Sequence, residues 1–210
     1  MSAAITPLNG LTASVSECTF TYMTQRANTL STADARRPVV AAAAVRAFAR
    51  GGYHGTTIAA VGAEAGISTA YVFKLFPGKE QLFVAALDYC FEQIEAALEA
   101  GAQAAQDVSA AGILDAMGDA YAELISDRAL LLLQVHAQSV ADVPEIGAAL
   151  RRGLERITRF AQARSGAADA DVQRFIAFGQ LCHLIVTAGI ADLDDGWAGV
   201  LNAGIRHPRG

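Results

Sequence analysis

The sequence predicts an all-α protein, and three observations support this fold class. First, the chain of 210 residues is 53% hydrophobic, rich in alanine and poor in proline, which is a composition typical of a helical globular protein. Second, apolar residues recur at the spacing of an amphipathic helix in most segments, and no segment alternates convincingly like a half-buried strand. Third, glycines, prolines and helix-capping residues stand between these periodic segments.

The N-terminal part predicts one helix after an irregular start. Residues 1–33 are rich in Ser, Thr and Ala and have no sustained apolar period, so we expect a disordered N-terminal arm. A helix should begin at Pro38, because a proline in the first turn removes no intrahelical hydrogen bond. Gly51 and Gly52 should end it.

Two short helices should follow. Thr56 or Thr57 can cap the first, which should end at Gly66. Ser68 can cap the second, which should end before Pro77. Two short helices joined by a tight turn that contains glycine form a helix-turn-helix.

The remaining chain predicts longer helices. The first should run from Lys79 to about Ala105. We expect further helices at 109–126, 128–141, 144–164 and 169–191, and a short one near 197–204.

Charge is distributed unevenly along the chain, whose formal net charge is −5. Residues 34–83 carry six basic and three acidic groups, whereas residues 84–210 carry nine basic and seventeen acidic groups. A basic module on an acidic body fits a protein that presents one end to a polyanion. Ordinary surface variation would also produce an asymmetry of this size.

Several classes of protein are disfavoured. No apolar run reaches the ~20 residues that a membrane helix needs, and the N-terminus lacks the pattern of a secretory signal. Cys18, Cys90 and Cys182 are odd in number and far apart, so they predict neither a disulfide framework nor a zinc site. We therefore expect a cytoplasmic protein without a membrane partner.

Residues 48–83, FARGGYHGTTIAAVGAEAGISTAYVFKLFPGKEQLF, carry a resemblance to a known family. The Gly-Tyr turn, the Thr pair, the Ala-Gly-Ile-Ser run and the Pro-x-Lys-Glu start of the next helix resemble the N-terminal DNA-binding domain of TetR-family transcriptional regulators. The resemblance covers about residues 34–94, with the helix-turn-helix at 57–76. It implies a sequence-specific DNA-binding regulator, a repressor that a small molecule releases from its operator, with residues 95–210 forming a helical ligand-binding and dimerisation domain.

The helix that follows Ser68 would present its start to the major groove of double-stranded DNA. Its apolar positions 72, 75 and 76 can pack inward, and the residues expected to reach DNA are Ser68, Thr69, Ala70, Tyr71 and Lys74. The resemblance adds backbone contacts from Phe73, from Lys79 and from the threonine that starts the preceding helix, Thr56 or Thr57. Phe73 stands where the family usually has tyrosine, so it keeps the ring but lacks the hydroxyl.

Some roles in this module stay open. Lys74 and Lys79 are the only lysines of the chain and suit phosphate contacts, but exposed lysines are often only solvated. Tyr71 either contacts DNA or supports the core. Ala59 and Ala60 replace a charged pair that is usual in the family, so the helix after Thr57 should make few contacts.

The resemblance also implies a homodimer, in which the last two long helices form a four-helix bundle with those of a second subunit. The apolar stripes of 144–164 and 169–191 supply the residues expected at this interface: Leu150, Leu154, Ile157, Phe175, Phe178, Leu181 and Ile185. Gly153 and Gly179 would allow close packing there. The alternative is burial of these stripes within one subunit.

A pocket for an unidentified small-molecule effector is implied by the family. The residues that combine apolar walls with a few polar groups, as such sites do, are Tyr89, Met117, Tyr121, Gln134, His136, Gln138 and His183. We expect no cofactor and no metal.

The sequence bears on two other classes of function. A helical enzyme is disfavoured, because Cys182 and His183 are adjacent in a helix and diverge by about 100°. The chain also lacks a Glu-x-x-His pair and a phosphate-binding loop. A helix-turn-helix protein that acts only in protein interaction remains the alternative, which DNA binding would distinguish.

Overall fold

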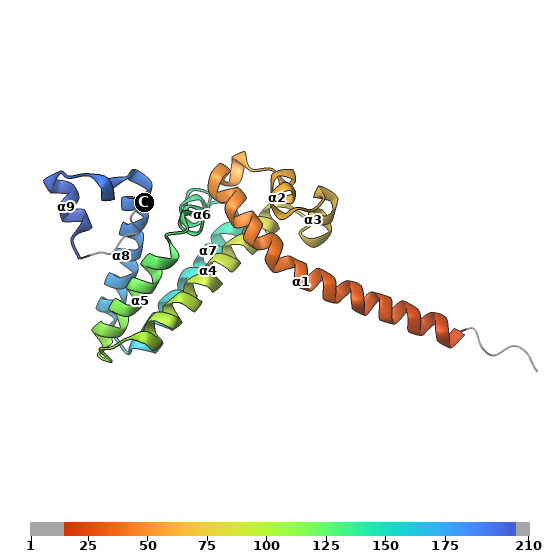
Figure 1. Ribbon diagram of the computed structural model, residues 1–210, viewed down its shortest axis with the longest axis horizontal. Coiled ribbons are helices and arrows are strands. Elements are labelled where there is room, and N and C mark those ends of the chain that lie inside the picture. The colour runs from red at the N-terminus through yellow and green to blue at the C-terminus, as the bar shows by residue number, and fades with distance from the viewer. Residues whose placement is uncertain (1–14, 205–210) are drawn as a thin grey trace, which may run out of the picture. The chain divides into compact units, whose positions relative to one another are not determined.

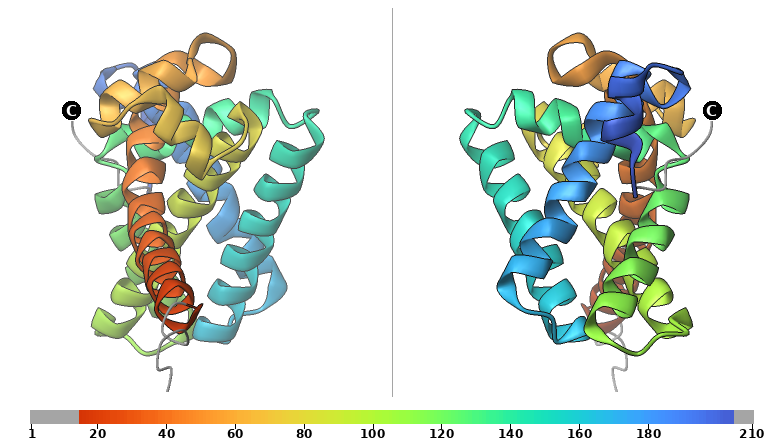
Figure 2. Two further views of the ribbon diagram at one scale, coloured as in Figure 1. Left: turned by 90° about the vertical axis from the view of Figure 1, so that its right-hand side faces the viewer. Right: turned by 90° about the vertical axis from the view of Figure 1, so that its left-hand side faces the viewer.

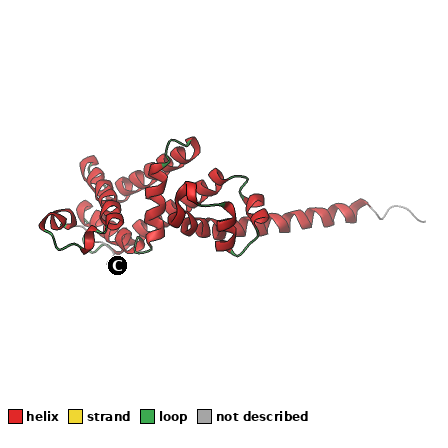
Figure 3. Cartoon of the chain, turned by 90° about the horizontal axis from the view of Figure 1, so that it is seen from above, coloured by secondary structure: helices red, strands yellow, loops and turns green. Residues whose placement is uncertain are grey.

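The computed structural model describes residues 15–204, with side chains described from residue 33 onward. All regular structure within that range is helical (Figure 3), which confirms the all-α prediction. The helices are α1 Val15–Gly55, α2 Ile58–Ala65, α3 Thr69–Leu75, α4 Lys79–Ala104, α5 Ala110–Leu124, α6 Arg128–Ser139, α7 Pro144–Ser165, α8 Asp169–Ala188, the 3₁₀ turn η1 Ile190–Asp192, and α9 Gly196–Asn202.

Helix α1 begins earlier than predicted. The structure describes residues 15–33 as part of this helix, so the predicted helix start at Pro38 is wrong, and residues 1–14 lie outside the described part. No glycine or proline interrupts the chain between residues 15 and 37, and Pro38 lies inside the helix. The chain divides into two units at this point, Met1–Pro38 and Val39–Gly210, and everything below concerns the second unit.

The end of α1 matches the prediction at Gly51 and Gly52. Gly52 has φ 63° and ψ −178°, which breaks the helical run, and a positive φ is strained for residues with a Cβ. The break turns the chain so that Thr56 comes back against α1, where its hydroxyl donates to Ala47 O at 3.1 Å.

Helices α2 and α3 are capped as the sequence predicts. Thr57 Oγ1 accepts a hydrogen bond from Ala60 N, and Ser68 Oγ accepts one from Tyr71 N. Gly66 ends α2 in the left-handed conformation. Each cap satisfies an amide that the helix itself leaves unpaired.

Gly62 allows the turn between these helices to fold back closely. A Cβ at Gly62 would lie 3.0 Å from Ile67 O and 3.5 Å from a methyl group of Val72. The amide of Ile67 donates to Gly62 O at 2.9 Å. The helix propensity lost at this glycine is therefore offset by a tighter helix-turn-helix.

Helix α4 is the centre of the larger helical body and runs beside α5 and α7 (Figures 1 and 2). Two glycines permit these close approaches: Gly101 faces the backbone of α5, and Gly153 of α7 lies against the ring of Phe91. Arginines of α7 pair with carboxylates of α4 along the outside, and the pairs are Arg152–Asp88, Arg156–Glu95 and Arg164–Glu99. Each such exposed pair contributes about 0–1 kcal/mol.

Substituting alanine for Gly101 should destabilise the fold by about 1–3 kcal/mol, because the added methyl group overpacks the α4–α5 contact. Its Cβ would lie 2.5 Å from Ala116 O and 2.9 Å from Ala120 Cβ. Urea unfolding followed by circular dichroism measures the change. Gly118→Ala is the matched control, since its Cβ would meet only Phe175, at 3.9 Å, and equal losses in both variants would contradict the proposed close contact.

No single helix of the described residues is long and apolar enough to cross a membrane. Helices α2 and α3 pass such a test only together, and they are bent by 100°.

Candidate nucleic-acid interface and ligand cavity

Helix α3 has two distinct sides. Val72 and Leu75 are 0% and 2% exposed, which confirms the predicted inward face. Phe73 and Lys74 lie in the outward part, with Phe73 48% exposed. Ser68 and Ala70 are also exposed, and Thr69 and Tyr71 are half-buried.

The two adjacent threonines have different environments. Thr57 is exposed at the start of α2, as Ser68 is at the start of α3. Thr56 is only 4% exposed, and its hydroxyl is used by Ala47 O. The prediction of Thr56 as a DNA contact is therefore corrected to an internal role, because a buried and bonded hydroxyl cannot reach a phosphate.

Lys79 is held at the first turn of α4. Its Nζ donates to His54 O at 3.2 Å and lies 4.9 Å from the centre of the Tyr53 ring. Tyr53 in turn donates to Glu80 Oε1 at 2.7 Å. Burial, followed by the bond with Glu80, raises the pKa of Tyr53 to about 12, so this tyrosine is a neutral donor that fixes the start of α4 against the end of α1.

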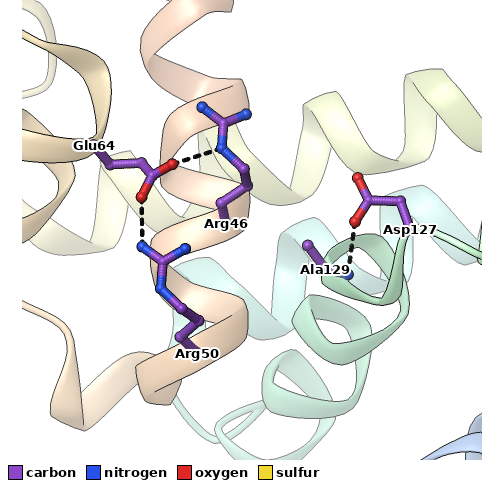
Figure 4. A network of polar contacts seen from close by, with 5 residues as sticks. All are labelled: Arg46, Arg50, Glu64, Asp127 and Ala129. Carbon is purple, nitrogen blue, oxygen red and sulfur yellow. Dashed lines mark hydrogen bonds and ion pairs between the residues drawn. The ribbon is translucent and has the colours of Figure 1, made fainter.

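A second polar contact joins α1 to α2, and sequence reasoning missed it. Arg46 Nε and Arg50 Nη2 donate to the two carboxylate oxygens of Glu64 at 2.7 and 2.5 Å (Figure 4). These bonds hold the pKa of Glu64 below its usual value. Glu64 thus attaches α2 to the basic side of α1 and fixes the orientation of the helix-turn-helix.

The helical body contacts the DNA-binding module through α6. Asp127 caps α6 by accepting from Ala129 N (Figure 4). One turn before the end of α6, His136 Nε2 lies 3.2 Å from Ala49 O, and a Cβ at Gly52 would lie 3.3 Å from His136 Nδ1. His136, a predicted pocket residue, therefore contacts the end of α1 instead of the cavity.

A cavity of about 350 Å³ lies inside the helical body. Helices α4, α5, α6, α7 and α8 all contribute to its walls. The lining residues are Phe91, Ile94, Leu98, Leu114, Asp115, Gly118, Asp119, Tyr121, Gln134, Leu154, Ile157, Phe175, Ile176, Phe178, Gly179, Gln180, Cys182 and Gly204. The walls are mainly apolar, with a few polar groups, as in small-molecule sites.

The structure brings only part of the predicted pocket together. Tyr121 and Gln134 line the cavity. Tyr89 and Met117 are not among its lining residues, and Met117 is fully buried in the core. Gln138 is exposed and donates to Gln180 Oε1, so it reaches the cavity only through a lining residue.

His183 belongs to a buried polar network beside the cavity. Tyr121 Oη lies 2.7 Å from His183 Nε2, and Gln134 Nε2 donates to the same Tyr121 oxygen at 3.3 Å. The phenol oxygen accepts from Gln134, and the tautomer of His183 decides which of Tyr121 Oη and His183 Nε2 donates in the bond between them. Burial lowers the pKa of His183 to about 4, so the ring is neutral, and its buried Nδ1 has no partner.

The structure corrects three members of the predicted dimer seam, because they are already buried in the single chain. The other four are half-buried or exposed, so their place in the interface stays a prediction. Leu150, Ile157 and Ile185 are 8%, 6% and 0% exposed in the single chain. Leu154, Phe175 and Phe178 line the cavity, together with Ile157, and Leu181 packs on the small core cluster of Ile185, Ile190 and Ala198. The apolar stripe of α7 thus faces inward, because α4 covers it.

The described residues contain no group of three or more His, Cys, Asp or Glu side chains that could hold a metal ion. Cys182 lines the cavity, but burial raises its pKa to about 11. A thiol with that pKa is protonated at neutral pH and is a poor nucleophile.

A capped, outward-facing α3 beside α2, joined to a helical body with its own cavity, defines a helix-turn-helix DNA-binding protein. Residues 40–86 match the family model of bacterial regulatory proteins, tetR family. The chain therefore carries the DNA-binding domain of TetR-family transcriptional regulators, and the resemblance predicted from the sequence is confirmed.

Solved structures share the fold over most of their length. A TetR-like transcriptional regulator from Rhodococcus sp. RHA1 is 20% identical, covering 79% of this chain and 91% of that one, with a TM-score of 0.56. The transcriptional regulator FadR from Bacillus subtilis, in complex with stearoyl-CoA, is 16% identical, covering 80% and 98%, with a TM-score of 0.61. The multidrug binding protein EbrR complexed with proflavin is 21% identical, covering 79% and 97%, with a TM-score of 0.52.

These identities show a common fold and nothing finer. No functionally curated protein matches the sequence significantly.

Proposed function

We propose that the protein is a cytoplasmic, homodimeric repressor. It binds an operator in double-stranded DNA and releases that operator when a small molecule fills the cavity. The observation that carries the proposal is the outward side of α3, where Phe73 and Lys74 are exposed on the side away from the buried Val72 and Leu75 and Tyr71 lies half-buried at the edge. A helix with an exposed start and a buried back suits insertion into the major groove. The protein acts by binding, and no step of this function needs a catalytic group.

The proposed DNA contacts are of two kinds: contacts to base edges, which determine the sequence recognised, and contacts to the phosphate backbone, which position the protein. Tyr71, Thr69 and Ala70 lie on the part of α3 that would enter the groove, where base edges are read. Ser68, Thr57, Phe73, Lys74 and Lys79 surround that part and are suited to the phosphate backbone. The hydrogen bond from Lys79 to His54 O and the position of its ammonium group over the Tyr53 ring orient that group in the absence of DNA.

The second subunit would pair through α8 and the segment that follows it. Eight large apolar side chains of the described residues are exposed, and five of them fall between residues 178 and 200: Phe178, Leu184, Leu193, Trp197 and Val200. Such a concentration of exposed apolar surface is typical of an interface. Two half-sites in the operator require two copies of α3, so the occupant proposed for this surface is a second copy of the chain.

Helix α6 connects the cavity to the DNA-binding module. Gln134 lines the cavity, and His136, two residues later on the same helix, bonds to Ala49 O of α1. A ligand that moves Gln134 therefore also moves the contact at Ala49. Structures that share the fold are in complex with stearoyl-CoA in FadR and with proflavin in EbrR, so the fold alone does not select one ligand.

Tyr71→Ala should reduce operator affinity by about 1–3 kcal/mol and random-DNA affinity by less, because it removes a contact to base edges. Fluorescence anisotropy on the intergenic DNA beside the protein's own gene and on a scrambled duplex gives both affinities. Tyr89→Ala, the same change on α4 beyond the matched residues 40–86, is the control and should leave both affinities unchanged.

The melting temperature of each variant must be measured alongside, since Tyr71 is half-buried. If Tyr71→Ala keeps both its melting temperature and its ratio of operator to random-DNA affinity, Tyr71 does not contact base edges. Failure of the unsubstituted protein to bind any duplex would favour a role in protein interaction alone.

A further inference from the structure

Three polar side chains from three helices meet at one wall of the cavity. Tyr121 of α5 and Gln134 of α6 line it, and His183 of α8 bonds to the Tyr121 hydroxyl without being a lining residue itself. All three side chains are buried. Buried polar groups are normally hydrogen-bonded, so the donors and acceptors of this network can be paired off one by one.

The amide of Gln134 uses both of its hydrogens. Its Nε2 donates to Leu130 O at 3.2 Å and to Tyr121 Oη at 3.3 Å. A backbone carbonyl oxygen can only accept, so the bond to Leu130 O identifies the nitrogen side of the amide. Tyr121 Oη is therefore the acceptor in its bond with Gln134.

The phenol of Tyr121 and the imidazole of His183 are both neutral at pH 7. Burial raises the pKa of Tyr121 above its usual value and lowers the pKa of His183 to about 4. Each group then carries one polar hydrogen. The two groups share a single bond, between Tyr121 Oη and His183 Nε2 at 2.7 Å.

One of these two hydrogens lacks an acceptor in either tautomer of His183. If the phenol donates to Nε2, the imidazole hydrogen lies on Nδ1, which is buried and has no hydrogen-bond partner among the described residues. If Nε2 donates to the phenol oxygen, the phenol hydrogen is left over. The network therefore has a donor to spare whichever nitrogen carries the hydrogen.

Gly179 leaves room beside the hydroxyl end of Tyr121. Apart from its chain neighbours and the backbone of its own helix, a Cβ at Gly179 would meet one described atom within 4 Å, Tyr121 Cε1 at 3.8 Å. This carbon is next to the ring carbon that bears the hydroxyl. A molecule in the cavity that brings an acceptor to this side can take the phenol hydrogen, while Nε2 donates to the phenol oxygen, and each hydrogen of the network then has an acceptor.

The remaining wall favours a compact ligand that is otherwise apolar. Phe91, Leu98, Leu154 and Phe175 are among the lining residues, and the cavity volume is about 350 Å³. This volume is near the lower end of the roughly 300–1,000 Å³ found for small-molecule sites. A carbonyl oxygen suits the spare donor, because it accepts a hydrogen bond, needs no counter-charge and brings no additional donor into the network.

We propose that the cavity binds a compact apolar carbonyl compound, such as a cyclic ketone or lactone, whose oxygen accepts the hydrogen of Tyr121 while His183 donates to the phenol oxygen. Tyr121 then determines the specificity of the cavity for a carbonyl group. The inference deepens the proposed function and rests on it for calling this compound the effector that releases DNA.

Two probes of nearly equal shape test the hydrogen bond. 1-Tetralone and tetralin share one bicyclic frame and differ by a carbonyl group. Isothermal titration calorimetry on the full-length chain should show that Tyr121→Phe weakens 1-tetralone by about 3- to 10-fold, the loss of one hydrogen bond, and changes tetralin by less than about twofold. An equal factor for both probes would mean that Tyr121→Phe only alters the shape of the cavity, and would overturn the proposal.

Tyr89→Phe is the matched control. It removes the same hydroxyl group from α4, at a half-buried position that does not line the cavity. Both probes should bind this variant as they bind the unsubstituted protein. Equal weakening of 1-tetralone by the two variants would also overturn the role of Tyr121.

The infrared carbonyl stretch of bound, isotope-labelled 1-tetralone reports the hydrogen bond without any substitution. In the unsubstituted protein the stretch should lie below its position in a hydrocarbon solvent, and in Tyr121→Phe it should move back toward that position. A hydrocarbon-like stretch in the unsubstituted protein, or failure of 1-tetralone to bind, would overturn the proposal even if Tyr121→Phe does not fold.

DNA binding is measured separately, so that the two proposals can fail separately. Binding of 1-tetralone that depends on Tyr121, in a protein that binds no duplex, would support the carbonyl site and remove the repressor function. Duplex binding by a protein whose affinity for 1-tetralone is independent of Tyr121 would do the reverse.

Discussion

Raising the salt concentration from 50 to 200 mM should weaken the binding of duplex DNA by roughly 10³–10⁵-fold, the loss expected for 6–10 phosphate contacts in a complex. Two copies of the module can supply such a number, since residues 34–83 of each copy carry six lysines and arginines in total. The body cannot contribute, because residues 84–210 carry nine basic and seventeen acidic groups. Anisotropy titrations over a salt series give the slope.

Lys74→Ala should lower the slope of log affinity against log salt concentration by about one for each copy of Lys74 that contacts a phosphate. Arg159→Ala is the control, because it removes the same charge from an α7 side chain whose ion pair among the described residues is with Glu155 in the same helix. A flat salt response of the unsubstituted protein would exclude phosphate contacts. Equal changes in slope for the two variants would show that net charge, and not the position of Lys74, is responsible.

Aspartate at Leu184 or Trp197 should convert the proposed dimer into monomers. These side chains are 52% and 53% exposed in the single chain, so a charge there is harmless to the fold but must be desolvated when two copies pair. Burying it costs several kcal/mol, and about 3 kcal/mol already weakens pairing by roughly 100-fold. Light scattering measures the mass, and operator affinity should fall with it because two half-sites are no longer linked.

Val108→Asp is the matched control, since Val108 is 83% exposed between α4 and α5. It should remain dimeric. Ile185→Asp would be uninformative, because Ile185 is fully buried and its loss would unfold the C-terminal cluster. A normal dimer from a soluble Leu184→Asp/Trp197→Asp protein would place the interface elsewhere.

The helix-turn-helix was predictable because its determinants are local. Thr57 and Ser68 cap the helices that follow them, and Gly66 takes the left-handed conformation that ends α2. Helix starts and stops of this kind depend on a few consecutive residues, so they can be recognised in the sequence. The attachment of α2 by Glu64 was missed, because its partners Arg46 and Arg50 are 18 and 14 residues away.

The body was predicted as helices but not as a packing arrangement. The sequence pattern of the apolar stripe of α7 is the same whether a second subunit or α4 covers it. The structure shows that Gly153 lies against the ring of Phe91 in α4. The pocket has the same difficulty. Tyr121 and Gln134 line the cavity whereas Tyr89 does not, and residue type alone cannot separate them, because the rotation of each helix is set by its neighbours.

Helix α8 has one side on the cavity and another in the proposed contact between subunits. Phe175, Gly179 and Cys182 line the cavity, and Leu184 points into the exposed apolar surface. Thermodynamic reciprocity then applies: whatever factor separates the effector affinities of monomer and dimer is also the factor by which the effector shifts the pairing equilibrium. The apparent affinity for the effector would therefore vary with protein concentration around the pairing constant, and the cellular abundance of the regulator would set its sensitivity.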